Sequence, residues 1–146
     1  MKILFFTHCY AKKDDSLKGT GRRVTPLELY KATPTQRFMR RCIKTKVNWA
    51  IFSDKHAFVF PNEKIEWYEK PPNTLTGAEK EELFNRAYSV LKNYGLTFFY
   101  FNPGRFHPAY RDLLEDMKRR GINMHACMHA CMHAHLERFT RQGDVS

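Results

Sequence analysis

The sequence predicts an α/β fold: a single domain of 146 residues, arranged as a three-layer sandwich around a mostly parallel central sheet. Two observations lead to this prediction. Three short apolar runs lack the apolar–polar alternation of a half-exposed strand, which is typical of strands covered on both faces. A segment with helical spacing of apolar residues follows each run, and strands that alternate with helices are typical of a parallel sheet.

The expected strands are apolar and rich in Phe, Ile and Trp, which favour extended backbone. They cover residues 2–7, 49–52 and 96–101, and a further apolar run over residues 57–60 returns after the second strand.

Capping signals predict where the helices begin. A capping box that starts at Thr25, with Pro26 at the first helical position, predicts the first helix, which Pro34 interrupts or splits. A second capping box at Thr76 predicts the next helix, and the third is expected near Pro108. The polar residues 14–25 between the first strand and the first helix predict a mobile basic loop.

Reactive and charged side chains follow all three strands. They occupy residues 8–13, 53–56 and 102–107. Because parallel strands end at the same edge of a sheet, these three loops are expected to converge there and to form a ligand site. The alternative is three unrelated solvated turns, with residues 53–56 closing a plain hairpin.

Each candidate residue has a chemical reason. Cys9, Ser53, Lys55 and His56 carry nucleophilic or titratable groups, and are the candidate catalytic residues. A neighbouring cation would lower the pKa of the Cys9 thiol. The candidate substrate- or phosphate-binding residues are Lys12, Lys13, Tyr68, Gly104, Arg105 and Tyr110.

Composition narrows the class of protein. Net charge is +10, which favours a polyanionic partner, first nucleic acid or a nucleotide and then an acidic membrane surface. Hydrophobic residues make up 42% of the chain, enough for a real core, yet no apolar run approaches a membrane span. With no signal peptide and four scattered cysteines, a cytoplasmic protein with free thiols is expected.

The chain carries a four-residue repeat, M-H-A-C-M-H-A-C-M-H-A-H, over residues 124–135. An amphipathic helix over residues 124–142 is expected, although the alternation also fits a strand. On a helix, His129 and His133 share one face and could supply two ligands of a zinc site. Zinc at this repeat is the only cofactor that the sequence suggests; the alternative is an ordinary amphipathic helix.

Taken in order, these positions resemble a family. It is a small uncharacterised α/β group related to the YaaA peroxide-stress proteins. The resemblance covers roughly residues 2–115, and a weaker one links the chain to the part of archaeosine synthase that is similar to uracil-DNA glycosylase. The matching positions are Cys9, Lys12 and Lys13; Glu28, Leu29 and Tyr30; Ser53, Lys55 and His56; Pro61, Glu63 and Tyr68; Gly104 and Tyr110.

Three features depart from the family pattern. Ala57 replaces the usual Gly after the Lys-His pair, Asp54 stands where a small residue is common, and the repeat over residues 124–135 has no counterpart. The Ala57 change argues against a role that needs a special backbone conformation there. The resemblance implies an α/β fold associated with nucleic acids or nucleobases and leaves the reaction open.

Three functions are therefore carried forward. The first is a protein that acts on nucleic acid or nucleobases, in base modification or repair. In it, phosphate would be held by Lys12, Lys13 and Lys55. Proton transfer or nucleophilic attack would fall to His56 or Cys9, and Tyr68 would stack on a base. The second is a non-catalytic binding module that uses the basic residues 37–46 together with Arg22 and Arg23. The third is a metal-binding or redox sensor that uses the repeat.

Overall fold

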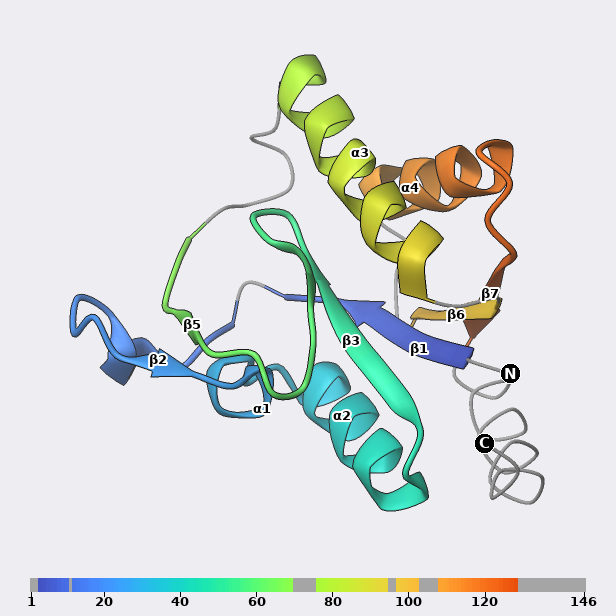
Figure 1. The fold of residues 1–146 in the computed structure, drawn as a ribbon. Helices are drawn as coiled ribbons and strands as arrows, with labels where there is room; N and C mark the ends of the chain where they lie inside the picture. Colours follow the sequence, from blue (N-terminus) through green and yellow to red (C-terminus); the bar gives the residue numbers. More distant parts are fainter. Residues whose placement is uncertain (1–2, 11, 70–75, 95–96, 103–107, 129–146) are drawn as a thin grey trace.

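The computed structural model describes residues 3–10, 12–69, 76–94, 97–102 and 108–128, and these form a single α/β domain. A mixed, mostly parallel five-stranded sheet lies between two helical layers (Figure 1). The strand order is β4-β3-β1-β6-β7, with β4 alone antiparallel. The strands of this sheet are β1 (Ile3–His8), β3 (Asn48–Ser53), β4 (Ala57–Val59), β6 (Thr97–Asn102) and β7 (Met124–Met128). The predicted fold class is confirmed.

The helices cover both faces of the sheet, which explains why the strands lack polar alternation. On one face lie α1 (Pro26–Leu29) and α2 (Thr33–Thr45), and on the other lie α3 (Gly77–Tyr94) and α4 (Pro108–Arg119) (Figure 1). Two core clusters result. One joins Phe5 and Trp49 to Phe38 and Met39 of α2, and the other joins alternate strand residues to Leu83, Leu91 and Leu113 of α3 and α4.

The helices begin where the capping residues predict. The Thr25 amide donates to Glu28 Oε1 at 3.4 Å before α1. The Glu79 amide donates to Thr76 Oγ1 at 3.2 Å before α3. The helix predicted from Pro26 is divided, because α1 ends at Leu29 and α2 begins at Thr33, directly before Pro34. None of the described helices is long and apolar enough to cross a membrane.

A small second sheet projects beside the main one (Figure 1). The short 3-10 helix η1 (Asp15–Leu17) and strand β2 (Arg23–Val24) lie within residues 14–25, for which the sequence predicts a mobile basic loop. β2 pairs antiparallel with β5 (Ile65–Glu66). This pairing holds the backbone at residues 65–66, two residues before Tyr68, and so helps to position the Tyr68 side chain.

The helix predicted over residues 124–142 is wrong at its start. Met124–Met128 forms strand β7, which pairs in parallel register with all but the first residue of β6, from Phe98↔Met124 to Asn102↔Met128. The alternating pattern of this segment fits both structures, and the free edge of β6 decides, because its unpaired backbone groups need a partner. Residues 129–142 lie outside the described residues.

Candidate functional site

The candidate site is built at the carboxyl ends of β1 and β3, which are neighbours in the sheet. His8 pairs with Phe52 in the strand register, and the Cys9 amide donates to the Phe52 carbonyl at 2.9 Å. Cys9 and Ser53 therefore leave the sheet side by side. We call Cys9, Lys13, Ser53, Lys55, His56 and Tyr68 the edge site.

A chain of hydroxyl groups lies at the centre of the edge site. Tyr68 Oη lies 2.7 Å from Ser53 Oγ and 2.6 Å from Tyr30 Oη. The same hydroxyl lies 3.8 Å from Cys9 Sγ. Cys9 follows β1, Tyr30 is the C-cap of α1, Ser53 ends β3 and Tyr68 follows β5. The hydroxyl of Tyr68 therefore connects parts of the chain that are distant in sequence.

The side chain of Ser53 stabilises the turn that contains Lys55 and His56. Its Oγ accepts hydrogen bonds from the amides of Lys55 and His56, each at 3.2 Å. Ser53 is fully buried and its oxygen is occupied, so its position favours a structural role over nucleophilic attack.

Ala57 closes this turn with φ 62°, a left-handed conformation that favours glycine. The special backbone conformation occurs here even though the chain has Ala where the resembling family has Gly. The expectation drawn from the Ala57 change is therefore wrong.

Two lysines from different loops approach the ring of Tyr68. Lys13 Nζ lies 4.4 Å and Lys55 Nζ 5.6 Å from the ring centroid, and the His56 ring meets it edge-on at 5.0 Å. Tyr68 itself is only 5% exposed. These neighbours cover the ring, which argues against Tyr68 stacking on a base, and its role in ligand binding stays a prediction.

The thiol of Cys9 is not activated. Burial, followed by the Asp54 carboxylate, raises the pKa of Cys9 to about 11, and Lys13 together with hydrogen bonds from Tyr68 and the Asp54 backbone lowers it only in part. The expected effect of a neighbouring cation is present, since Lys13 lowers the pKa of Cys9, but burial in an apolar site outweighs it.

The pKa of His56 is shifted in the opposite direction from that of Cys9. Burial lowers the pKa of its half-buried imidazole, and the positive charges of Lys55 and Arg86 lower it further. Its Nε2 is buried and has no hydrogen-bond partner among the described residues. Arg86 reaches this corner from α3, since its Nη1 donates to the Lys55 carbonyl at 2.9 Å. His56 is thus a neutral base in a positively charged environment.

A second polar cluster lies at the same edge on the side of α3 and α4. The His8 ring stacks on Tyr110 with centroids 4.2 Å apart, and its Nδ1 is hydrogen bonded to Tyr100 Oη. Tyr110 Oη donates to Asp54 Oδ2 at 3.3 Å. Tyr110 is buried, so this candidate ligand-binding residue supports Asp54 and His8 instead of facing solvent.

Sequence reasoning assigned no role to four members of these clusters: His8, Tyr30, Asp54 and Tyr100. His8 and Asp54 adjoin chosen candidates, and Tyr30 stands in a quoted motif. Nothing in the sequence singles out Tyr100, which reads as an ordinary strand residue.

The remaining candidates lie apart or outside the description. The side chain of Lys12 is exposed beside the edge site. Gly104, Arg105, His129 and His133 lie outside the described residues. Within the described ranges, no group of three or more His, Cys, Asp or Glu residues could hold a metal ion. The predicted zinc site at the repeat stays a prediction.

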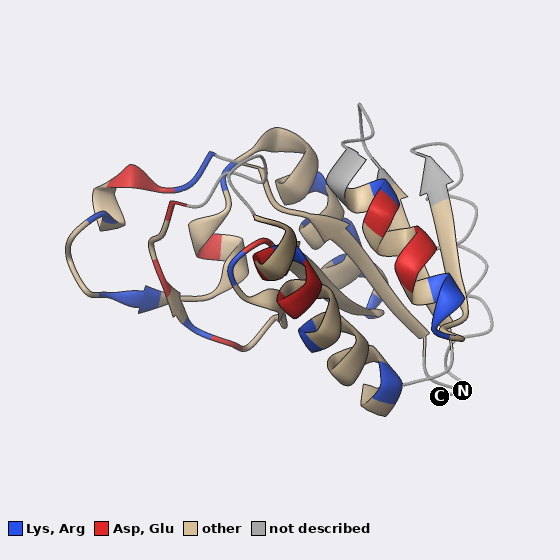
Figure 2. Ribbon diagram, turned by 90° about the horizontal axis from the view of Figure 1, so that it is seen from above, with Lys and Arg blue, Asp and Glu red and all other residues tan. Residues whose placement is uncertain are grey.

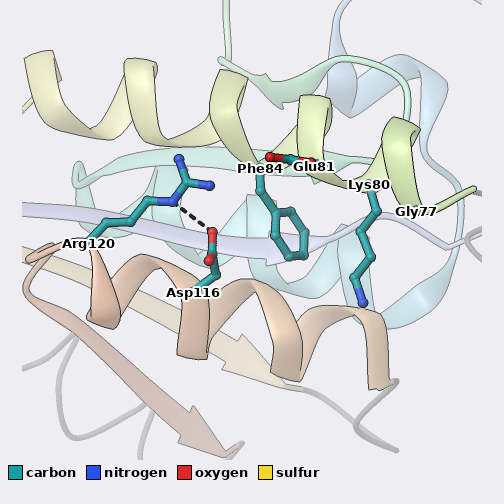
Figure 3. Close-up of a pocket in the computed structure, with 6 residues that line it drawn as sticks. All are labelled: Gly77, Lys80, Glu81, Phe84, Asp116 and Arg120. Atoms are coloured by element: carbon teal, nitrogen blue, oxygen red, sulfur yellow. Dashed lines mark ion pairs between the residues drawn. The ribbon is translucent and has the colours of Figure 1, made fainter.

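A shallow hollow elsewhere on the surface lies between α3 and α4 (Figure 3). Its lining residues are Gly77, Lys80, Glu81, Phe84, Asp116 and Arg120. Arg120 Nε lies 2.8 Å from Asp116 Oδ2, and Lys80 pairs with Asp112. Because most of its charged groups already have partners, this hollow is a weaker candidate than the edge site.

Comparison of the chain with protein-family models, curated proteins and solved structures finds no match.

Proposed function

We propose that the protein binds nucleotide units of nucleic acid at the edge site and acts in base modification or repair. One observation carries the proposal. The ammonium groups of Lys13 and Lys55, from loops about forty residues apart, converge on one tyrosine ring. Neither ammonium is in an ion pair within the described part of the chain. Such unpaired cations favour an anionic ligand, and a phosphate group is the anion that a nucleic acid offers.

The side chains have distinct roles in this proposal. Lys13 and Lys55, with exposed Lys12 beside them, hold phosphate. His56 takes the proton-transfer role, because an imidazole with a lowered pKa is neutral near pH 7 and can accept a proton. Cys9 and Ser53 support the site through the hydroxyl chain. The YaaA-like resemblance favours the same class of partner.

The experiment compares edge-site variants with a variant of equal charge. Two double variants each remove two positive charges: Lys13→Gln/Lys55→Gln at the edge site, and the matched pair Lys64→Gln/Lys92→Gln elsewhere. Lys64, directly before β5, and Lys92, in α3, are both exposed. Binding of untagged protein to a short duplex DNA, a single strand and a tRNA is measured across a salt series. The edge-site pair should weaken binding at least tenfold more than the matched pair.

Two results would reject the proposal. Equal losses from the two pairs would mean that net charge alone drives binding. Unchanged binding in Lys13→Gln/Lys55→Gln and in His56→Asn would mean that the edge site is not where nucleic acid binds.

The second candidate is a binding module without catalysis, and the exposed Arg37, Arg40 and Lys44 of α2 favour it. It is distinguished by mass spectrometry of the nucleosides after incubation with the protein. A new or missing base that depends on His56 supports catalysis, and unchanged bases with intact binding support the module.

The metal or redox function of the repeat is tested by metal analysis of untagged protein, where zinc, copper and nickel all far below one equivalent would reject it.

A further inference from the structure

The outer face of α2 carries an uninterrupted row of positive charge. Between Leu29 and Ser53 the chain has no Asp or Glu. The same segment contains six cations, Lys31, Arg37, Arg40, Arg41, Lys44 and Lys46. It therefore supplies a large part of the net charge of +10.

Helical spacing gathers four of these cations on one stripe. Positions 37, 40, 41 and 44 are three, four and seven residues apart, so they share one side of the helix. Arg37, Arg40 and Lys44 are exposed, whereas the opposite side of α2 buries Thr35, Phe38, Met39 and Cys42. We call Arg37, Arg40 and Lys44 the α2 stripe.

Other helices do not show this pattern. On α3 and on α4, positive and negative residues lie along the same helix (Figure 2). Each ion pair among the described residues joins α3, α4 or the turn after α4, and none involves the α2 stripe. Ile43, the one large hydrophobic residue that is exposed in the described part of the chain, lies next to the stripe at 48% exposure.

The α2 stripe is physically connected to the edge site. The connection from the carboxyl end of β1 to the amino end of β3 contains η1, β2, α1 and finally α2. Because β3 runs parallel to β1, α2 leads back across the sheet and begins on the side of the edge site. Gln36, in the turn before Arg37, donates through Nε2 to the Tyr30 carbonyl at 2.6 Å. The hydroxyl of Tyr30 belongs to the hydroxyl chain of the edge site.

The dimensions of the stripe match a nucleic-acid backbone. Seven residues of helix advance about 10 Å. Each strand of a duplex carries one phosphate per about 3.4 Å of axis, so the stripe spans about three phosphate steps of one strand.

We infer that the ligand of the edge site is a nucleotide within a polynucleotide and not a free nucleotide, with the α2 stripe holding the phosphates of the flanking strand. This inference rests on the proposed function of the edge site. An anionic membrane is the competing partner of a basic helix, but the stripe lacks the broad apolar face that inserts into lipid, since that face of α2 is buried in the core.

The test uses two triple variants of the whole chain. Arg37→Gln/Arg40→Gln/Lys44→Gln removes the stripe, and Lys64→Gln/Lys92→Gln/Lys118→Gln removes three exposed charges elsewhere. The ligands are a dinucleotide and a single strand of ~12 nucleotides, within the range of sizes that single-strand sites accommodate. Affinities are measured between roughly 50 and 200 mM salt.

The stripe variant should bind the longer strand at least tenfold more weakly and bind the dinucleotide unchanged. The slope of log affinity against log salt should fall by about 2, since each lost phosphate contact contributes about 0.7 on a single strand. The control variant should change both far less. Arg37→Lys/Arg40→Lys should retain binding, which shows that charge and not folding is responsible.

Other outcomes overturn the inference in different ways. If the longer strand binds no tighter than the dinucleotide, or the stripe variant binds it normally, the inference fails while the edge site stands. If the stripe variant weakens the longer strand but Lys13→Gln/Lys55→Gln changes neither ligand, the proposed function fails and the inference with it, leaving a separate binding surface. Stripe-dependent binding to anionic vesicles without binding to the strand would assign the stripe to membrane.

Discussion

The hydroxyl groups of Ser53 and Tyr68 lie 2.7 Å apart and join the end of β3 to the segment that follows β5. Tyr68 Oη also lies 2.6 Å from Tyr30 Oη, so one oxygen connects three elements of the fold. This contact holds the turn that carries Lys55 and His56 against the ring that both of them touch. The edge site therefore depends on a buried polar contact between residues distant in sequence.

Removing that oxygen should destabilise the protein. Tyr68→Phe keeps the ring but leaves the buried hydroxyl of Tyr30 without this partner, and an unsatisfied buried group costs about 1–3 kcal/mol. The free energy of unfolding, measured by urea denaturation, should fall by that amount. The control is Tyr88→Phe, because no hydrogen bond of the Tyr88 hydroxyl occurs among the described residues. Equal stability of the two variants would show that the hydroxyl chain contributes nothing.

Cys9 should be slow to react. With its pKa raised to about 11, the thiolate fraction at pH 8 is about a hundredfold smaller than for a thiol with a pKa of 9.0. Alkylation by iodoacetamide, followed by peptide mass mapping, should be at least a hundredfold slower for Cys9 in the native protein than in urea. Rapid native labelling of Cys9 near neutral pH would contradict the inert thiol and revive a nucleophilic role.

Anion binding should become tighter as the pH falls. The pKa of His56 is lowered by burial and by Lys55 and Arg86, and a bound phosphate would favour the protonated imidazole and raise it. A dinucleotide is the right probe, because its phosphodiester does not titrate in this range. Its affinity should rise as the pH is lowered below about 6.5. In His56→Asn this rise should be reduced or lost; an identical pH profile would remove His56 from the anion site.

The same lowered pKa affects stability with a definite sign. Below about pH 6.5 the unfolded chain takes up a proton at His56 more readily than the folded chain does. Stability should therefore fall as the pH drops from that value through the lower pKa of the folded state. Without ligand, His56→Asn should lose less stability than the wild type over this window, as thermal unfolding at several pH values would show. A larger loss in the variant would mean that folding does not lower the pKa of His56.

The conformation of Ala57 predicts an unusual response to glycine. Its left-handed backbone costs about 1–2 kcal/mol, so Ala57→Gly relieves strain while losing a buried methyl group and restricting a more flexible residue. The net change in the free energy of unfolding should be smaller than about 1 kcal/mol. Ala87→Gly, at a buried position within α3, should cost about 2 kcal/mol, because it loses a methyl group and helix propensity together. Equal costs at the two positions would argue against the strained turn.

The sequence by itself determined the elements and their layers. Apolar runs without alternation predicted strands covered on both faces, and the capping residues Thr25 and Thr76 predicted the helix starts. These signals act within a few residues, so they can be recognised without the fold. The convergence of residues 8–13 with residues 53–56 also followed, because parallel neighbouring strands must end at one edge.

Only the tertiary structure decided what each side chain does there. Lys13 and Lys55 meet at Tyr68 because β2 pairs with β5, a pairing too short to predict. Burial and distant charges raise the pKa of Cys9 and lower that of His56, and both effects depend on contacts far apart in the chain. Residues 124–128 form a strand because β6 offers an edge to pair with, although their own pattern suits a helix equally well.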